Sequence, residues 1–322
     1  MNITFRQMRL FLALADTGSV SRAAAAMHVT QPTASMQLRE VTEALGLPVY
    51  EVIGRKVYLT QAGHALADCA RTMVGEWERL EQTIGLLRGL QKGRLNVSVV
   101  STAKYFIPRL IGQFCQDHPH IDVAIEVLNR DGVVQRLRDN RDDLYVMSQP
   151  PRDMDLEDRV FMDNPLVLIG PDPDPHAPAP QRWSDLRHQR LILRETGSGT
   201  RMAVDASFAE HRFRSGVLME LGSNEAIKEA VAAGLGYGIV SQHALGRDLN
   251  RSGLRIVPLP GFPIASNWHV VYPRRKCLSP LADKFLQRLT LLGDLPDGSP
   301  DRRRQKADTL EHPHGLQKQK GP

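Results

Sequence analysis

Residues 20–39 carry polar side chains at spacings that suit contact with DNA. The stretch SRAAAAMHV is typical of a small-residue helix that a second helix crosses closely, and the turn Val29-Thr30 follows it. Thr30 or Gln31 can cap the next helix, and Pro32 suits its first turn because the missing N–H is not needed there. Glutamine and serine read base edges, and arginine binds guanine or phosphate. The layout predicts a helix–turn–helix, with an Ala-rich helical hairpin as the alternative.

A second group of candidates lies where strands are expected to end and helices to begin, beyond residue 93. The segment 194–201 (RETGSGTR) opens a helix, and its backbone N–H groups can bind phosphate or carboxylate. It lacks the Gly-Lys-Ser/Thr of a P-loop. Arg130, Arg201 and Lys104 can add charge-assisted hydrogen bonds, although each polar residue here could serve only as a cap. The candidate effector-binding residues are Ser101, Thr102, Lys104, Asn129, Arg130, Met147, Glu195, Gly197, Ser198, Thr200, Arg201 and Asn224.

Nothing in the sequence supports catalysis. The histidines form no HExxH or other metal-ligand spacing, and no GxSxG motif is present. Cys69, Cys115 and Cys277 are widely spaced, so they indicate neither a disulfide framework nor a zinc site. We therefore expect no enzyme, no metal and no tightly bound cofactor.

The elements that must position these residues fall into three regimes. The chain is helical in pattern to about Thr60, and a long helix is expected from there to Leu90. From Leu95 onward, strands alternate with helices, which predicts βαβ units and a mainly parallel sheet. A Pro-rich segment, 171–180, separates two such series. A strand at 267–273 (NWHVVYP) and an amphipathic helix at 279–292 are expected to close the fold.

The long helix has a narrow apolar stripe. Its apolar positions recur in alternating steps of four and three residues, which is typical of a coiled-coil seam. The alternative is a surface helix that packs on the C-terminal domain. We expect the stripe to pair two copies of the chain, with Trp77 as its anchor. Its residues are Leu66, Ala70, Met73, Trp77, Leu80, Ile84 and Leu87.

Length and composition narrow the class of protein. The chain has 322 residues, which suits about two domains. Its apolar fraction of 42% and charged fraction of 24% exclude a disordered or collagen-like chain. The net charge of +5 permits nucleic-acid binding without requiring it. No signal peptide or membrane-spanning run is evident, so we expect a cytoplasmic protein without a membrane partner.

Nearly sixty consecutive residues, FRQMRLFLALADTGSVSRAAAAMHVTQPTASMQLREVTEALGLPVYEVIGRKVYLTQAG, resemble the winged helix–turn–helix of LysR-type transcriptional regulators. The resemblance places a wing at residues 54–57. Met36 stands where many members have Arg, which shifts the expected base contacts to Gln31, Ser35 and Gln37. The cations are expected to contact phosphates. The expected DNA-binding residues are Arg22, Thr30, Gln31, Pro32, Thr33, Ser35, Met36, Gln37, Arg39, Arg55 and Lys56.

The resemblance implies an α+β multidomain protein with a C-terminal, two-lobed α/β effector domain similar to periplasmic binding proteins. In such a fold a ligand binds in the crevice between the lobes. The expected organisation is a winged helix–turn–helix at 1–61, a linker and dimerisation helix at 62–92, and an effector domain at 93–295. Within the last, lobe I spans about 93–165 and 268–295, lobe II spans about 166–267, and a disordered tail follows at 296–322.

Several C-terminal stretches, among them LRETGSGTRMAVDASFAEH and ELGSNEAIKEAVAAGLGYGIVS, resemble the LysR-type activators of RuBisCO operons. This implies transcriptional control of Calvin–Benson–Bassham cycle genes in response to a phosphorylated sugar or acid, or NADPH. The implied partners are double-stranded operator DNA, a second or further copies in a homodimer or homotetramer, and RNA polymerase. A LysR-type regulator of another metabolic operon is the first alternative. An α/β solute-binding protein or enzyme is the second.

Overall fold

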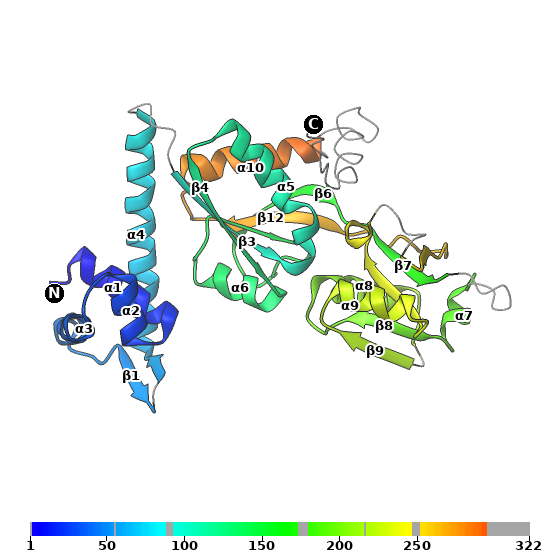
Figure 1. Ribbon diagram of the computed structural model, residues 1–322, viewed down its shortest axis with the longest axis horizontal. Coiled ribbons are helices and arrows are strands. Elements are labelled where there is room, and N and C mark those ends of the chain that lie inside the picture. Colours follow the sequence, from blue (N-terminus) through cyan, green and yellow to red (C-terminus); the bar gives the residue numbers. More distant parts are fainter. Residues whose placement is uncertain are drawn as a thin grey trace, which may run out of the picture. The chain divides into compact units, whose positions relative to one another are not determined.

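The computed structural model describes residues 2–54, 56–87, 93–172, 180–215, 217–246 and 252–294. The chain forms two compact units, one with the N-terminal helices and one with both larger sheets (Figure 1). The tail from residue 295, most of the Pro-rich segment and the end of the expected linker helix beyond Leu87 lie outside the described residues, as does Arg55.

The N-terminal unit is a three-helix core with a hairpin. Its helices are α1 (Phe5–Thr17), α2 (Val20–Ala26) and α3 (Gln31–Leu45), and its strands are β1 (Tyr50–Ile53) and antiparallel β2 (Lys56–Leu59). Small residues where α2 meets α3 let the helices approach closely. The buried residues shared by these elements are Leu10, Phe11, Leu14, Ala23, Ala24, Ala34, Leu38, Val41 and Val49.

The long helix α4 (Gln61–Leu87) follows strand β2 directly. Thr60 caps it, because its Oγ1 accepts a hydrogen bond from the Gly63 backbone N–H at 3.1 Å. Gly63 lies against the β1 side of the hairpin so closely that an added Cβ would stand 1.8 Å from the Val49 carbonyl oxygen. The junction between the hairpin and α4 therefore depends on a glycine.

The second unit contains two sheets, which we call lobe I and lobe II. Lobe I has the strand order β4-β3-β5-β12-β6. Helices α5 and α10 pack together through Phe114 and Phe285, whose ring centroids lie 5.1 Å apart. Helix α6 packs with Tyr145, Met147 and other residues of β5, β6 and β12. The elements are β3 (Gly93–Val100), the 3-10 helix η1 (Ser101–Tyr105), α5 (Ile107–Asp117), β4 (Ile121–Leu128), α6 (Arg130–Arg138), β5 (Leu144–Met147), β6 (Leu156–Asp163), β12 (Asn267–Pro273) and α10 (Pro280–Asp294).

Lobe II has the strand order β11-β7-β10-β8-β9. Helices α8 and α9 contribute to different core clusters, α8 through Val204 and Phe208 and α9 through Ile227 and Val231. The elements are β7 (Leu166–Pro171), α7 (Trp183–Leu186), β8 (Arg190–Arg194), α8 (Gly199–Glu210), β9 (Val217–Leu221), α9 (Asn224–Ala232), β10 (Tyr237–Ser241), the 3-10 helix η2 (Gln242–Ala244) and β11 (Leu254–Ile256).

The prediction of a mainly parallel sheet is wrong in both lobes. In lobe I, β3 is parallel to β4 and β5, whereas β12 is antiparallel to β5 and β6. In lobe II, β7 is antiparallel to β10 and β11. The expectation failed for two reasons. Strand β6 (LEDRVFMD) is rich in charge and was not recognised, and the strands that follow a crossing between the lobes, β7 and β12, run antiparallel to their neighbours. The predicted strand at 267–273 is confirmed.

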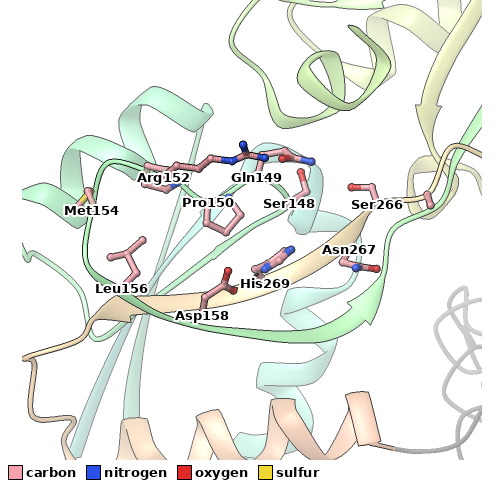
Figure 2. A pocket seen from close by; sticks show the side chains of 12 residues that line it. Ser148, Gln149, Pro150, Arg152, Met154, Leu156, Asp158, Ser266, Asn267 and His269 are labelled. Atoms are coloured by element: carbon pink, nitrogen blue, oxygen red, sulfur yellow. Dashed lines mark hydrogen bonds and ion pairs between the residues drawn. The ribbon is translucent and has the colours of Figure 1, made fainter. Parts of the chain in front are cut away.

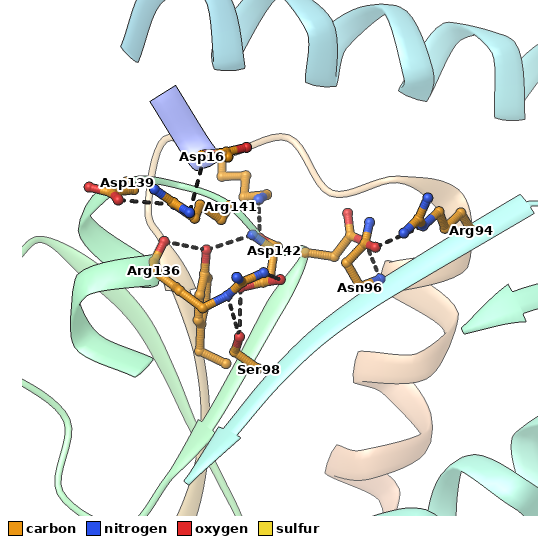
Figure 3. Close-up of polar contacts among 11 residues, drawn as sticks. Asp16, Arg94, Asn96, Ser98, Arg136, Asp139, Arg141 and Asp142 are labelled. Atoms are coloured by element: carbon orange, nitrogen blue, oxygen red, sulfur yellow. Dashed lines mark hydrogen bonds and ion pairs between the residues drawn. The ribbon is translucent and has the colours of Figure 1, made fainter. Parts of the chain in front are cut away.

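A buried ion pair ties α6 to the lobe I sheet (Figure 3). Arg136 binds Asp142 through two hydrogen bonds of 2.8 and 2.6 Å, and the Ser98 hydroxyl donates to the same carboxylate at 2.7 Å. Hydrogen bonding to Asp142 raises the pKa of Arg136. Because removing one partner of such a pair leaves a buried charge, this cluster holds the end of α6 in place.

None of the helices in the described residues has the length and apolar character that a membrane-spanning helix needs.

Candidate functional site

Helix α3 presents the residues that were expected to read DNA. Its buried face, Ala34, Leu38 and Val41, packs on the core of the N-terminal unit. Gln31, Pro32 and Arg39 are exposed on it, and Met36 is 56% exposed. Thr33, Ser35 and Gln37 are half-buried. The amphipathic pattern of α3 therefore directs the predicted polar face to solvent.

Hydrogen bonds organise the first turns of this face. Thr30 is the N-cap, since its Oγ1 accepts a bond from the Thr33 backbone N–H at 3.4 Å, which decides between the two predicted caps. The Gln31 amide donates to the Ser35 hydroxyl at 3.2 Å. Among the described residues the Gln37 side chain has no hydrogen-bond partner. Gln37 thus offers a complete amide, which can pair with adenine.

The cationic side chains around this face differ in how freely they could contact DNA. Arg39 forms an exposed ion pair with Glu43 at 2.8 Å, which is a weak interaction that DNA can replace. Arg22 donates to the Thr17 carbonyl oxygen. Lys56 is exposed at the start of β2. The predicted hairpin turns at Gly54, whose φ of +66° suits a glycine. Arg55, the other predicted cation of the wing, lies outside the described residues.

Helix α4 exposes an apolar stripe that its own unit does not cover. Met73, Trp77, Leu80 and Ile84 are each between 38% and 50% exposed. The Trp77 ring lies 5.7 Å from the Phe5 ring, and its Nε1–H donates to Glu81 at 2.7 Å. Nothing is described of the Leu87 side chain. An uncovered stripe of this kind marks an interaction surface.

Lobes I and II meet at a cluster of polar side chains centred on Arg194. The Arg194 guanidinium, which ends β8 and is 3% exposed, donates to Thr102 Oγ1 at 3.2 Å and to Ser101 Oγ at 3.3 Å. Asn224, at the start of α9, also donates to Thr102 Oγ1 at 3.3 Å. The Asn224 Oδ1 is buried without a hydrogen-bond partner in the described structure. An unpaired buried acceptor is costly, so it indicates a place where a ligand or water binds.

The positive charge of Arg194 is neutralised by its neighbour. Glu195 accepts two hydrogen bonds from the guanidinium, each of 2.7 Å. This bidentate geometry is the one in which arginine binds a carboxylate or phosphate of a ligand. The Glu195 carboxylate therefore holds the position on Arg194 that an anionic ligand would seek.

A second bridge between the lobes lies beside the first. The Tyr105 hydroxyl donates to Glu225 at 2.6 Å, and Lys104 pairs with the same carboxylate at 3.2 Å. Burial, together with the hydrogen bond to Glu225, raises the pKa of Tyr105, so it remains a donor. Burial is the largest single effect on Glu225 and opposes its ionisation, but the hydrogen bonds from Tyr105, Lys104 and the backbone, with the charge of Lys104, together lower the pKa of Glu225.

The structure brings Ser101, Thr102, Lys104, Glu195 and Asn224 together at this lobe contact. The other predicted effector residues serve local structure as well. Asn129 accepts from the Gly132 N–H at 2.9 Å, and Arg130 donates to the Gln149 carbonyl at 3.1 Å. Ser198 caps α8, and Gly197 forms the preceding turn with a φ of +89°. Thr200 is 5% exposed, and Met147 is fully buried in the cluster beneath α6.

The arginine that lies at the lobe contact is Arg194, whereas the hydrogen bonds of the predicted residue, Arg201, lie within lobe II. Arg201 binds Asp205 and Glu220, each at 2.9 Å, so its charge is used within lobe II. Arg194, Tyr105 and Glu225 are not among the predicted effector residues, although Arg194 belongs to the predicted segment 194–201. Arg194 stands at the last position of an apolar strand, LILR, where a charge has to find a buried partner, and that was the available signal.

Two family models and several known proteins match the chain. Residues 5–64 match the bacterial regulatory helix-turn-helix protein of the lysR family, and residues 88–291 match the LysR substrate binding domain. The HTH-type transcriptional activator CmpR of Synechocystis sp. is 42% identical over 89% of this chain and 95% of its own. A RuBisCO operon transcriptional regulator of Acidithiobacillus ferrooxidans is 40% identical over 89% of this chain and 93% of its own.

Among solved structures, the Synechocystis CcmR regulatory domain in complex with 2-PG is similar, with a TM-score of 0.58 and 42% identity over 62% of this chain and 97% of that one. The family matches cover both the helix–turn–helix and the two-lobed unit, and the geometry of each agrees with a DNA-binding and a ligand-binding role. The chain therefore belongs to the LysR family of bacterial helix-turn-helix transcriptional regulators, and it is a regulator rather than an enzyme.

Proposed function

We propose that this LysR-type regulator activates a RuBisCO operon, and with it Calvin–Benson–Bassham carbon fixation, in response to an anionic metabolite. The similarity to a RuBisCO operon regulator over nearly the whole chain supports the choice of target. The observation that carries the choice of an anion is Arg194, a buried guanidinium that joins the two lobes through Ser101 and Thr102. A LysR-type regulator of another operon remains the alternative.

We infer that the effector binds at the lobe contact. Thr102 Oγ1 accepts two hydrogen bonds, which leaves its own O–H free to donate to an anion. The anionic group of the effector displaces Glu195 from Arg194, and a hydroxyl group of the effector donates to the unpaired Asn224 Oδ1. Exchange of one carboxylate for another keeps the local charge balanced while the hydrogen bonds between the lobes change. A ligand that binds the two arrangements with different affinity shifts the equilibrium between them.

The oligomer and the DNA complex follow from the N-terminal unit. We assign the exposed stripe of α4 to pairing with a second copy, which matches two DNA-reading helices to a pseudo-palindromic operator. Two such dimers form the tetramer, and the bound regulator recruits RNA polymerase. A protein that binds operator DNA acts in the cytoplasm of a bacterium.

The test is binding of the full-length protein to DNA from upstream of the RuBisCO large-subunit gene, measured by fluorescence anisotropy and by DNase footprinting with and without candidate effectors. The probes are 2-PG, phosphoenolpyruvate, a pentose phosphate and NADPH. We expect specific binding and a footprint that changes with one of these anions. Binding no tighter than to random DNA contradicts the target, whereas specific binding that no anion alters contradicts the effector.

A further inference from the structure

Lobe I contains a cavity that is separate from the lobe contact (Figure 2). Its volume is about 590 Å³, and it is lined by the segment 148–158, which runs from the end of β5 into β6, and by residues 265–269 at the start of β12. Known ligand pockets have volumes of roughly 300–1,000 Å³. None of Thr102, Arg194 and Asn224 lines it.

A group of polar side chains without partners faces this cavity. The Ser266 hydroxyl is buried and has no hydrogen bond in the described structure. The side chains of Gln149, Arg152 and Asn267 likewise have no hydrogen-bond or ion-pair partner among the described residues. Buried polar groups in folded proteins are normally paired. The unpaired Ser266 hydroxyl therefore indicates a missing partner. Gln149, Arg152 and Asn267, which are half-buried or exposed, are free to bind the same partner.

A hydrogen-bonded pair, Asp158 and His269, lies on the opposite side of the cavity from Arg152 and Gln149 (Figure 2). With Nδ1 protonated, His269 donates to Asp158 at 2.6 Å. The register of β12 against β6 shifts between Trp268 and His269, and such an irregularity can redirect a side chain. The pair leaves one Asp158 oxygen and His269 Nε2 available to the cavity. Polar groups that are held in place before a ligand arrives reduce the entropy cost of binding.

The lining defines the chemistry of the ligand. The Arg152 guanidinium suits a carboxylate or phosphate. The remaining polar groups of Ser266, Asn267 and Asp158 suit hydroxyl groups. Met154 and Leu156, which also belong to the apolar cluster beneath α6, form an apolar wall for a short carbon chain. We propose that this β6–β12 pocket binds a second ligand, a small hydroxylated organic anion, in addition to the effector at the lobe contact.

The pocket and the lobe contact share one segment of chain. Arg130, a predicted effector residue, donates to the Gln149 carbonyl. Ser148 lines the pocket, and an added Cβ on Gly199 of α8 would stand 2.5 Å from its Oγ. A ligand that moves residues 148–149 therefore changes how α8 packs against lobe I. By linkage, the second ligand and the effector alter each other's affinity by the same factor.

Methyl NMR of the full-length protein labelled at methionine tests the proposal. Met154 lines the pocket, and the other methionines serve as internal references. The probes are glycerol 3-phosphate and glycerate, with glycerol and inorganic phosphate as the separate halves of the first. We expect one of the hydroxylated anions to shift the Met154 signal, with half-saturation about tenfold below that of either half. Arg152→Ala should raise this half-saturation about tenfold.

Thr102→Ala, at the lobe contact, serves as the control and should leave the titration of Met154 in place. Three results would overturn the proposal. They are no Met154 shift with either hydroxylated anion up to about 20 mM, equal titration in wild type and Arg152→Ala, or loss of the shift in Thr102→Ala. The last result would assign the ligand to the lobe contact, and the proposed effector site would stand without a second pocket.

Discussion

At the scale of residues, the pairing of Arg194 with Glu195 determines what the lobe contact can bind. A guanidinium that is 3% exposed would be costly without a counter-ion, so Glu195 stabilises the protein while no ligand is present. The same carboxylate competes with an anionic effector. The residue that stabilises the free protein thus also sets its affinity for ligand.

Replacement of Glu195 by Gln should strengthen effector binding. The amide keeps the shape of the carboxylate but leaves the charge of Arg194 available, so we expect about tenfold tighter binding of the anion that alters the footprint. Calorimetry on the full-length protein measures this. Asp205→Asn removes a partner of Arg201 instead and should leave the affinity within about twofold. Weaker binding in Glu195→Gln would show that Glu195 itself holds the ligand.

Glu225 should make the stability of the two-lobed unit depend on acid pH. Its pKa in the folded protein lies below the ordinary value of 4.5, so its contribution is complete above that value and is lost as the pH falls through the folded pKa. Urea unfolding of wild type and Glu225→Gln should therefore differ most near neutral pH and converge in acid. A difference that is constant with pH would rule out the ionised carboxylate as the cause.

Base reading by α3 is a property of single residues. Gln37→Ala should weaken binding to operator by about 1–3 kcal/mol and leave binding to random DNA unchanged, because it removes a contact to a base edge. Arg39→Ala is the matched control on the same face. Since Arg39 is expected to contact phosphate, its loss should weaken both complexes and lower the salt dependence. Equal losses on both DNAs for Gln37→Ala would reassign it to the backbone.

At the scale of elements, the sequence predicted helices better than sheets. Period and capping residues located the helix–turn–helix, and Thr30 caps α3 as expected. Strand β6 was missed because LEDRVFMD is rich in charge and shows no alternation, and only Leu156 and Phe161 are buried, through tertiary contacts. The candidate site could likewise be predicted only where local sequence was enough. Ser101 and Thr102 are recognisable as polar residues at the end of a strand, whereas their hydrogen bonds with Arg194 join residues more than ninety positions apart.

The junction of β1, β2 and α4 should be sensitive to a single methyl group. Gly63→Ala would place a Cβ 1.8 Å from the Val49 carbonyl oxygen, so the strand or helix has to shift. We expect a loss of about 1–3 kcal/mol in the free energy of unfolding, measured by chemical denaturation. Gly75→Ala, on α4 with open space around it, should be neutral or stabilising. Equal effects of the two would mean that the contact is not tight in solution.

At the scale of the whole molecule, the proposed DNA recognition requires a second copy of the chain. Four large apolar residues of α4 are exposed, and a helix of this length presents them as one stripe. Trp77→Ser with Leu80→Ser should convert the dimer to a monomer, seen by light scattering, with specific DNA binding weakened at least tenfold. Val127→Ser, at an exposed apolar residue of β4, is a control for the mere loss of surface hydrophobicity.

The most direct test of the central proposal is the transcript level of the RuBisCO large-subunit gene in the bacterium that encodes this protein. Deletion of the regulator should abolish induction of that gene under autotrophic growth. The wild-type copy should restore induction, whereas a copy with Arg194→Gln should bind the promoter but fail to respond. Unchanged induction in the deletion strain would contradict the assignment of this regulator to carbon fixation.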